Sequence, residues 1–298
     1  MDCPIQLLEY SQRFNQKLPE YFRHPIGQEK RVTEAMQYSV MNGGKRLRPF
    51  LVYETAKLFG INFEQSLNCA VAIECLHSYS LIHDDLPAMD NDDLRRGKPT
   101  CHKAYDEATA ILAGDGLLTY AFEILSSTET HSSPEVRCNL ISALSKGAGA
   151  FDGMIAGQML DLIAEKNNSA LEPEKLIKHI EEMKTGRLIS FSCQAGAILG
   201  QASQDEQQAI YEYSRNIGIS FQITDDILDV TGSQELMGKK LQKDDAQGKI
   251  TFVNLYGLEK AKQIVRDLTL SAQKTLDIFG KKSQTLKDLA QFIADRNH

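Results

Sequence analysis

Two clusters of aspartates interrupt parts of the chain that are otherwise apolar. The acidic side chains are Asp84, Asp85 and Asp90 in the first cluster and Asp225, Asp226 and Asp229 in the second. A buried carboxylate without a partner is very costly, so we expect each cluster to line a cavity and to meet cations there. Mg²⁺ binds one or two carboxylates together with substrate phosphates and water. The clusters therefore predict the opposing walls of one magnesium site, for a substrate that carries phosphate.

The spacing inside each cluster predicts which carboxylates lie together. Asp225 and Asp229 are four residues apart, so on a helix they lie one above the other. Asp84 and Asp90 are six residues apart, and a straight helix does not align them. Pro87 breaks the helical hydrogen bonds between them, so we expect a turn that returns Asp90 to the side of Asp84. A calcium-binding loop is the alternative, but the twelve-residue ligand pattern of such loops is missing.

Basic residues follow the acidic ones at positions where a phosphorylated ligand needs them. A glycine-rich turn that enters a helix carries three of these cations, and two more come shortly after the first aspartate cluster: Lys45, Arg46, Arg48, Arg95 and Arg96. Arginine suits bidentate phosphate binding, whereas lysine acts as a point charge. Each cation alone is typical of a solvated surface. Together with two aspartate clusters, the set predicts a diphosphate site.

The overall composition limits the classes of function. The chain has 298 residues, of which 42% are hydrophobic and 24% charged, and its net charge is −7. These values are ordinary for a globular protein and argue against a general nucleic-acid binder. Anionic ligands stay compatible with the negative net charge, because the local charge of a cavity decides their binding.

Targeting signals and cysteines predict the compartment. The N-terminal residues lack the basic start and apolar run of a signal peptide, and no run of about 18 apolar residues predicts a membrane helix. The six cysteines are scattered and show no Cys-x-x-Cys pair. In a chain of this size they indicate reduced thiols of a cytoplasmic protein.

Helical periodicity dominates the elements that must position these residues. Apolar residues recur at three- and four-residue spacings in 67–82, 105–127, 134–165, 173–199, 205–230, 256–279 and 284–295. Strand and hairpin patterns are missing, so we predict an all-α protein with a single domain over 1–298. Glycines at four-residue spacing in 143–161 predict close helix packing. The charged connections 91–102 and 231–249 are expected to act as lids.

The motifs resemble those of the short-chain trans-prenyl diphosphate synthases, in particular the bacterial farnesyl diphosphate synthase branch. In order along the chain they are Gly43-Gly44-Lys45-Arg46-Leu47-Arg48-Pro49, Asp84 to Asp90 with Arg95-Arg96-Gly97, Gly157-Gln158, Lys184-Thr185-Gly186, Phe221-Gln222 with Asp225 to Asp229, Met237-Gly238-Lys239 and Gly248-Lys249. A lone Asp-Asp-x-x-Asp motif is weak, but this ordered set spans nearly the whole chain. The resemblance implies an isoprenoid-synthase-type helical bundle around a deep central cavity, in a homodimer.

The resemblance also implies two substrate sites. The allylic diphosphate is held through Mg²⁺, with up to three ions, by Asp84, Asp90 and Asp225, which Asp85, Asp226 and Asp229 support. Its direct partners are implied to be Arg95, Lys184, Thr185, Gln222 and Lys239. The isopentenyl diphosphate site is implied to contain Lys45, Arg48, His77 and Arg96. Ionisation of the allylic C–O bond then depends most on Asp84, Asp90, Arg95, Lys184, Asp225 and Lys239.

The residues one turn before the first cluster are expected to set the length of the product. Ser80 lies one turn below Asp84 on the same helix face, and Tyr79 lies beside it. A bulky Tyr79 resembles synthases that stop at fifteen carbons, so the expected product is farnesyl diphosphate, formed by two successive additions. Ordinary packing is the alternative role of Tyr79, and products of ten or twenty carbons stay open.

Three other classes remain as alternatives. A terpene cyclase shares the first motif but does not need Lys45, Arg48 and Arg96 for a second diphosphate. A di-iron oxidase fits Glu74 and His77 as one Glu-x-x-His element, but that class needs two such elements. A non-catalytic partner subunit of a related synthase is expected to lose an aspartate motif, and this chain keeps both. The sequence predicts a small-molecule enzyme that binds neither nucleic acid nor membranes.

Overall fold

The computed structural model describes residues 3–23, 26–165, 172–231 and 251–296. Their regular structure is helical apart from one short antiparallel ribbon, which confirms the all-α prediction. The chain forms two compact units, residues 1–141 and 142–298, and the boundary falls inside helix α7. The single domain and its central cavity stay predictions. All six cysteines are free thiols, in line with the expectation from their spacing.

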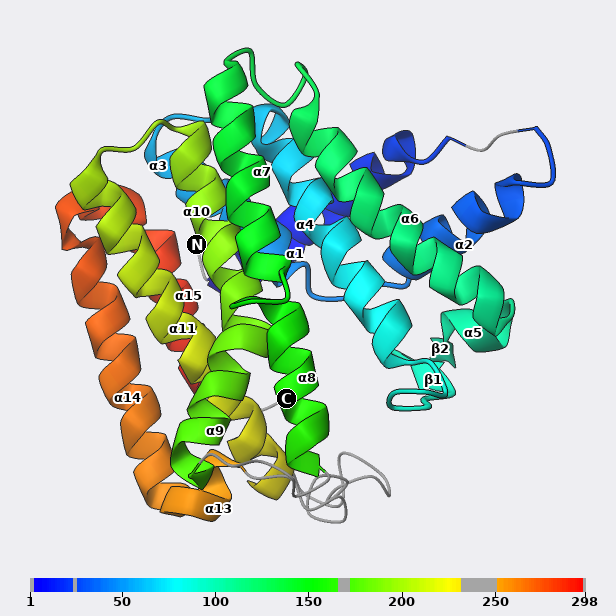
Figure 1. Ribbon diagram of the computed structural model, residues 1–298. Helices are drawn as coiled ribbons and strands as arrows, with labels where there is room; N and C mark the ends of the chain where they lie inside the picture. Colours follow the sequence, from blue (N-terminus) through cyan, green and yellow to red (C-terminus); the bar gives the residue numbers. More distant parts are fainter. Residues whose placement is uncertain (1–2, 24–25, 166–171, 232–250, 297–298) are drawn as a thin grey trace. The chain divides into compact units, whose positions relative to one another are not determined.

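Unit 1 is built around a long buried helix, α4. Its elements are α1 (Cys3–Lys17), η1 (Leu18–Tyr21), α2 (Lys30–Val40), α3 (Leu47–Leu58), α4 (Phe63–Asp84), β1 (Leu94–Arg95), β2 (Lys98–Pro99), α5 (Cys101–Ala104), α6 (Glu107–Ser126) and the first part of α7 (Pro134–Ala148). A capping box between Asn62 and Gln65 fixes the start of α4, since it satisfies two otherwise unpaired amide groups. Helices α2, α3 and α6 pack around α4 (Figure 1).

Helix α6 is the most apolar long helix of unit 1. By length and composition it could cross a membrane, the one helix of the described ranges that passes this test. It packs against α2, α4 and α5, and Ala113, Leu117 and Leu125 are fully buried. Much of the apolar surface of α6 is therefore buried in the core of unit 1.

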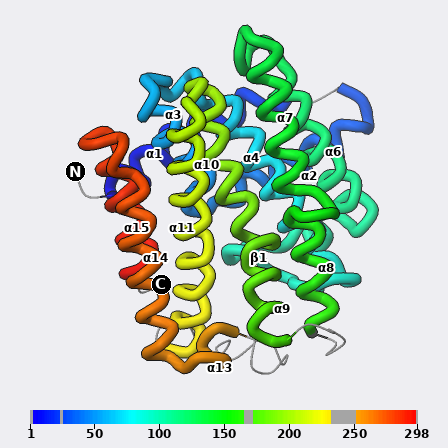
Figure 2. The backbone as a smooth tube through the Cα atoms, turned by 60° about the vertical axis from the view of Figure 1, so that its left-hand side comes forward, coloured from blue at the N-terminus to red at the C-terminus, as the bar shows by residue number. Residues whose placement is uncertain are grey.

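Unit 2 is a bundle in which α11 lies between α10 and α14 (Figures 1 and 2). Its elements after α7 are α8 (Met154–Glu165), α9 (Pro173–Ile180), η2 (Glu181–Gly186), α10 (Arg187–Leu199), α11 (Gln204–Thr231), α13 (Phe252–Tyr256), α14 (Leu258–Thr275), η3 (Leu276–Ser283) and α15 (Gln284–Asp295). Ile223 of α11 packs with Phe252 and Val265 in a buried apolar cluster. This packing fixes α11, which carries the second aspartate cluster.

The structure corrects one of the helix predictions and adds a detail to another. The single helix predicted over 134–165 is broken between Ala148 and Met154, in the glycine-rich segment. The helix predicted over 173–199 is continuous, but its middle turn, η2, is a π-helix. A π-helical turn inserts an extra residue into the helix and is frequent at functional sites. Lys184 and Thr185 lie on this turn.

Candidate active site

The turn predicted inside the first aspartate cluster, between Asp84 and Asp90, is confirmed. Helix α4 ends at Asp84, three residues before Pro87, and the Asp90 amide donates to the Asp84 carbonyl at 2.9 Å. The Asn91 amide closes the same turn on the Leu86 carbonyl at 3.1 Å. The backbone therefore returns Asp90 to the end of α4, although six residues separate it from Asp84. Their roles as metal ligands stay predictions.

Asp85 holds Arg95 in a bidentate ion pair. The Arg95 guanidinium donates to Asp85 Oδ2 from Nε at 2.9 Å and to Oδ1 from Nη2 at 2.6 Å. Asp85 is buried, and burial raises the pKa of its carboxyl group while Arg95 acts in the opposite direction. The planar fork of arginine fits this geometry. Asp85 therefore orients the guanidinium that is predicted to meet the allylic diphosphate.

Arg46 does not belong to the ligand side of its glycine-rich turn. Its guanidinium is buried, forms an ion pair with Glu74 and donates to the Val40 carbonyl at 2.8 Å and to Asn15 Oδ1 at 2.9 Å. Arg46 is one of the three cations predicted on this turn, but its contacts are structural, because they tie the turn to α4. The same pair accounts for Glu74, which the di-iron alternative assigned to a metal.

Cations surround His77 in the predicted isopentenyl diphosphate site. Arg48 Nη1 lies 3.3 Å from His77 Nε2, and Arg96 donates to the Gly43 carbonyl. Burial, followed by the charges of Arg48 and Arg96, holds the pKa of His77 well below its usual range. In the described part of the chain, Arg48 Nε has no hydrogen-bond partner. Neutral His77 beside a half-buried guanidinium is an environment that an anion would stabilise.

Tyr79 and Ser80 lie one turn before the aspartates on α4. The ring of Tyr79 is buried and packs edge-on against His83, with ring centres 5.0 Å apart. Burial raises the pKa of Tyr79, with Asp84 as the next cause. The Ser80 hydroxyl donates to the His77 carbonyl at 2.8 Å. These contacts fix both side chains, while their role in product length stays a prediction.

In unit 2 the second aspartate cluster already meets a cation of the chain. Arg296 Nη2 lies 2.7 Å from Asp225 Oδ1 and also donates to the Phe221 carbonyl at 2.6 Å. The guanidinium stacks on the Phe221 ring, 3.9 Å from its centre, and the Arg296 side chain is only 8% exposed. No sequence pattern predicted this contact, because 71 residues separate the partners.

The neighbouring aspartate has a different structural task. Asp226 Oδ2 accepts a hydrogen bond from the Phe252 amide at 2.8 Å, at the first residue of α13. This bond ties the acidic end of α11 to the start of α13. Asp226 thus anchors α13, while its supporting role in the metal cluster stays a prediction.

Lys184, the predicted partner of the leaving diphosphate, also has a partner within unit 2. Its ammonium group lies 2.5 Å from Asp161 Oδ2 on α8. Thr185 follows it on the same π-helical turn, and Gln222 lies on α11. The other predicted diphosphate partner, Lys239, lies outside the described residues, as do Met237-Gly238, Gly248-Lys249 and nearly all of the 231–249 connection.

Comparison with known proteins identifies the family. The polyprenyl synthetase model matches residues 29–295, which is most of the chain. The chain belongs to the polyprenyl synthetase family. It is 43% identical over 305 aligned residues to the farnesyl diphosphate synthase of Escherichia coli K12, with full coverage of both chains. It is 41% identical to that of Geobacillus stearothermophilus, with 98% and 97% coverage.

Solved structures agree with this polyprenyl synthetase fold. An FPP/GFPP synthase from Zymomonas mobilis matches with a TM-score of 0.88 and 41% identity, covering 98% of each chain. A geranyltransferase from Legionella pneumophila matches with a TM-score of 0.85 and 34% identity, covering 99% and 97%. Relatives of another product class also match, since a geranylgeranyl pyrophosphate synthase from Capsicum annuum is 44% identical over 90% of this chain.

The donor atoms of this polyprenyl synthetase fit Mg²⁺. Both clusters offer carboxylate oxygens, which suit a hard cation. Within the described ranges, no group of three or more His, Cys, Asp or Glu side chains is arranged to hold an ion unaided. Mg²⁺ usually completes its shell with water and substrate phosphate, so one or two carboxylates are a sufficient protein contribution.

Glu181 is a site residue that the motifs did not reveal. It begins the π-helical turn, and burial, followed by the charge of Asp226, raises its pKa to about 8. A hydrogen bond with Gln222 acts in the opposite direction, and Glu181 Oε2 has no hydrogen-bond partner among the described residues. A glutamate in an otherwise helical, amphipathic segment gives no sequence signal of this environment.

The raised pKa of Glu181 predicts a pH-dependent stability. Folded Glu181 binds a proton up to about pH 8, whereas its ordinary pKa is 4.5, so wild-type stability falls as pH rises between these values. Glu181→Gln cannot titrate. The Tm of Glu181→Gln minus the Tm of wild type should therefore rise from pH 5 to pH 8 and then level off. Thermal unfolding across this range measures it, with Glu182→Gln as the control. A constant difference contradicts the prediction.

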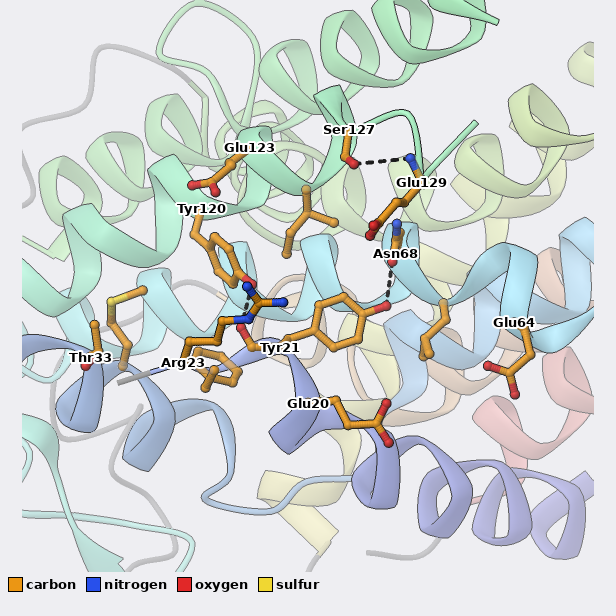
Figure 3. A pocket seen from close by; sticks show the side chains of 14 residues that line it. Glu20, Tyr21, Arg23, Thr33, Glu64, Asn68, Tyr120, Glu123, Ser127 and Glu129 are labelled. Atoms are coloured by element: carbon orange, nitrogen blue, oxygen red, sulfur yellow. Dashed lines mark hydrogen bonds between the residues drawn. The ribbon is translucent and has the colours of Figure 1, made fainter. Parts of the chain in front are cut away.

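One pocket of unit 1 lies away from these motifs. It has a volume of about 650 Å³ and lies among η1, α4 and α6 of unit 1 (Figure 3). The carboxylates of Glu20, Glu64, Glu123 and Glu129 line it together with Arg23. None of the predicted diphosphate or metal residues contributes to it, so its size does not mark the reaction site.

Proposed function

We propose that this protein is a farnesyl diphosphate synthase. It condenses isopentenyl diphosphate first with dimethylallyl diphosphate and then with geranyl diphosphate, which yields (2E,6E)-farnesyl diphosphate. The observation that carries this proposal is the identity of 41–43% to several bacterial farnesyl diphosphate synthases over essentially the whole chain. The presence of both aspartate motifs argues for an active synthase over a non-catalytic subunit.

The proposed mechanism begins with the departure of the allylic diphosphate. Asp84, Asp90 and Asp225 hold this group through Mg²⁺, which supplies positive charge to the leaving oxygens when it is bound. Arg95, kept in place by Asp85, binds the same diphosphate. Lys184 adds a further charge, and we assign the same task to Lys239. Preorganised cations of this kind stabilise charge as the C–O bond breaks.

The second substrate provides the electrons for the new bond. Arg48, with neutral His77 beside it, binds isopentenyl diphosphate together with Lys45 and Arg96. The double bond of this substrate attacks the allylic cation and forms a carbon–carbon bond. The adduct then loses a proton, which the departing diphosphate accepts. Exclusion of water by an apolar cavity protects the cation until the new bond has formed.

The family resemblance supports three further features of the proposal. We expect up to three Mg²⁺ ions with bound diphosphate, a homodimer, and a cytoplasmic location. Ile111 and Leu112 are exposed on α6 of unit 1, and apolar residues on an otherwise well-packed helix fit a contact with a second subunit. Size-exclusion chromatography with light scattering measures the subunit number directly.

The deciding experiment is a synthesis assay with product sizing. Purified protein is incubated with isopentenyl diphosphate, dimethylallyl diphosphate and Mg²⁺, and the products are measured by chromatography and mass spectrometry. Farnesyl diphosphate as the main product is the expected result. A reaction that does not require isopentenyl diphosphate would instead indicate a terpene cyclase.

A geranylgeranyl diphosphate synthase is the second candidate, because relatives with that name match at 39–44% identity. Tyr79 provides a test between a floor of the product cavity and ordinary packing. Tyr79→Ala removes a buried ring one turn before Asp84, so we expect products of twenty carbons or more to increase at the expense of farnesyl diphosphate. Tyr105→Ala is the control. Unchanged product length in Tyr79→Ala contradicts the floor role.

A further inference from the structure

Asp161 is an acidic residue of α8 that none of the recognised motifs includes. Its carboxylate Oδ2 lies 2.5 Å from the ammonium group of Lys184. We infer that Asp161 is a positioning residue, which holds Lys184 in the orientation needed to bind the leaving diphosphate. The inference rests on the proposed function, because that function makes Lys184 a diphosphate partner.

The close approach of two backbones brings this pair together. Gly157 of α8 faces the π-helical turn so closely that a Cβ at this position would lie 2.8 Å from the Cα of Lys184. Real Cβ atoms do not reach such a distance from backbone, so the contact requires glycine. Asp161 lies four residues after Gly157, on the same helix face. The Lys184 side chain therefore leaves the contact point in the direction of the Asp161 carboxylate.

The two side chains are sheltered but not fully buried. Lys184 is 28% and Asp161 is 16% exposed. A sheltered pair is screened less than a surface pair, so it restrains the long lysine stem more effectively. An ammonium group has three N–H donors. Asp161 accepts from it at one position and leaves the remaining donors available for diphosphate oxygens.

Glu181 lies three residues before Lys184 on η2. The pKa of Glu181 responds to the charges of both Asp161 and Lys184, which indicates that the three groups are electrostatically coupled. Without the Asp161 carboxylate, the long Lys184 side chain loses this ion pair and can adopt other orientations.

A neighbouring ion pair supplies a matched control. Asp152 lies just before α8, and its Oδ2 lies 2.6 Å from Nη2 of Arg187, the residue that follows η2. This pair also joins the start of α8 to the segment around η2, but Asp152 is 66% exposed and Arg187 has no predicted substrate role. Asp152→Asn therefore removes the same charge from the same region without touching Lys184.

The test compares Asp161→Asn with Asp152→Asn in the full-length protein. For Asp161→Asn we expect kcat/KM for geranyl diphosphate to fall by about 10- to 100-fold, the usual cost of a misplaced binding group. The KM for isopentenyl diphosphate should change by less than about 2-fold, since that site lies on other residues. Asp161→Glu should restore part of the activity because it restores the charge. Asp152→Asn should behave as wild type.

A binding measurement separates this inference from the proposed function. Calorimetric titration with inorganic pyrophosphate and Mg²⁺ should show binding weaker by about 10-fold in Asp161→Asn than in Asp152→Asn. This binding measurement can be made whether or not the protein synthesises prenyl diphosphates. If the wild-type protein makes no prenyl diphosphate, only the proposed function is refuted. Pyrophosphate binding that is unchanged or tighter in Asp161→Asn overturns the positioning role, since tighter binding would mean that Asp161 only competes with the ligand.

A double-mutant cycle covers the case in which Asp161→Asn folds poorly. Asp161→Glu and Lys184→Gln are compared alone and together, and each is checked by thermal unfolding. If Asp161 acts through Lys184, a change at Asp161 has little further effect on pyrophosphate binding once Lys184 is replaced. Equal effects of the Asp161 change with and without Lys184 contradict the inference.

Discussion

Asp84→Ala should lower kcat for farnesyl diphosphate synthesis by about a thousandfold at saturating Mg²⁺, because it removes a carboxylate that holds the leaving diphosphate through the metal. Asp84 ends α4, and the turn around Pro87 brings the Asp90 backbone to its carbonyl. A neighbouring carboxylate cannot move into this position without breaking that turn. Steady-state assays with geranyl and isopentenyl diphosphate measure the effect.

Asp93→Asn is the matched control for this prediction. It lies on the connection after the same turn, is 74% exposed and pairs with Lys103 at 2.9 Å. We expect it to keep wild-type turnover within about 2-fold, as is usual for a surface charge. Near-normal turnover of Asp84→Ala at ordinary Mg²⁺ concentrations would refute the proposed role of the first aspartate cluster.

Glu74→Ala should reduce the free energy of unfolding by about 3–5 kcal/mol, because it leaves the Arg46 guanidinium buried without a counter-charge. Both side chains of this pair are almost fully buried, at 1% and 4% exposure. Arg46 would keep its bonds to the Val40 carbonyl and to Asn15, but neither group carries a charge. Urea unfolding followed by circular dichroism measures the loss.

Glu64→Ala is the control for the buried pair. Glu64 lies on the same helix and pairs with Arg13 at 3.0 Å, but both side chains are more than half exposed. Surface pairs contribute about 0–1 kcal/mol, so this variant should unfold close to wild type. Similar unfolding curves for Glu64→Ala and Glu74→Ala would contradict the assignment of Arg46 and Glu74 as a structural pair.

Much of the fold was predictable because the relevant signals are local. Periodicity located the long helices, and α11 runs from Gln204 to Thr231 where the sequence predicted 205–230. Pro87 predicted the turn after Asp84 through its effect on the preceding backbone. The ordered motifs predicted the family, which the match over residues 29–295 confirms.

The partners of the site residues were not predictable in the same way. Arg46 with Glu74, Lys184 with Asp161 and Asp225 with Arg296 are contacts between distant parts of the chain. Charge type alone does not choose among 33 basic and 40 acidic residues. The π-helical turn was also missed, since hydrophobic periodicity is nearly the same for one irregular turn as for a regular one.

The contact between Arg296 and Asp225 has a consequence for the Mg²⁺ that we propose at the second cluster. An ion that uses this carboxylate meets a guanidinium already seated on one of its oxygens. A metal ion that binds Asp225 must therefore displace Arg296 or share the carboxylate with it. Because the guanidinium is tethered, its local concentration is constant, while that of the metal varies. We therefore expect a diphosphate that carries its own magnesium to shift this exchange more than free magnesium does, which would couple occupancy of the site to the arrival of substrate.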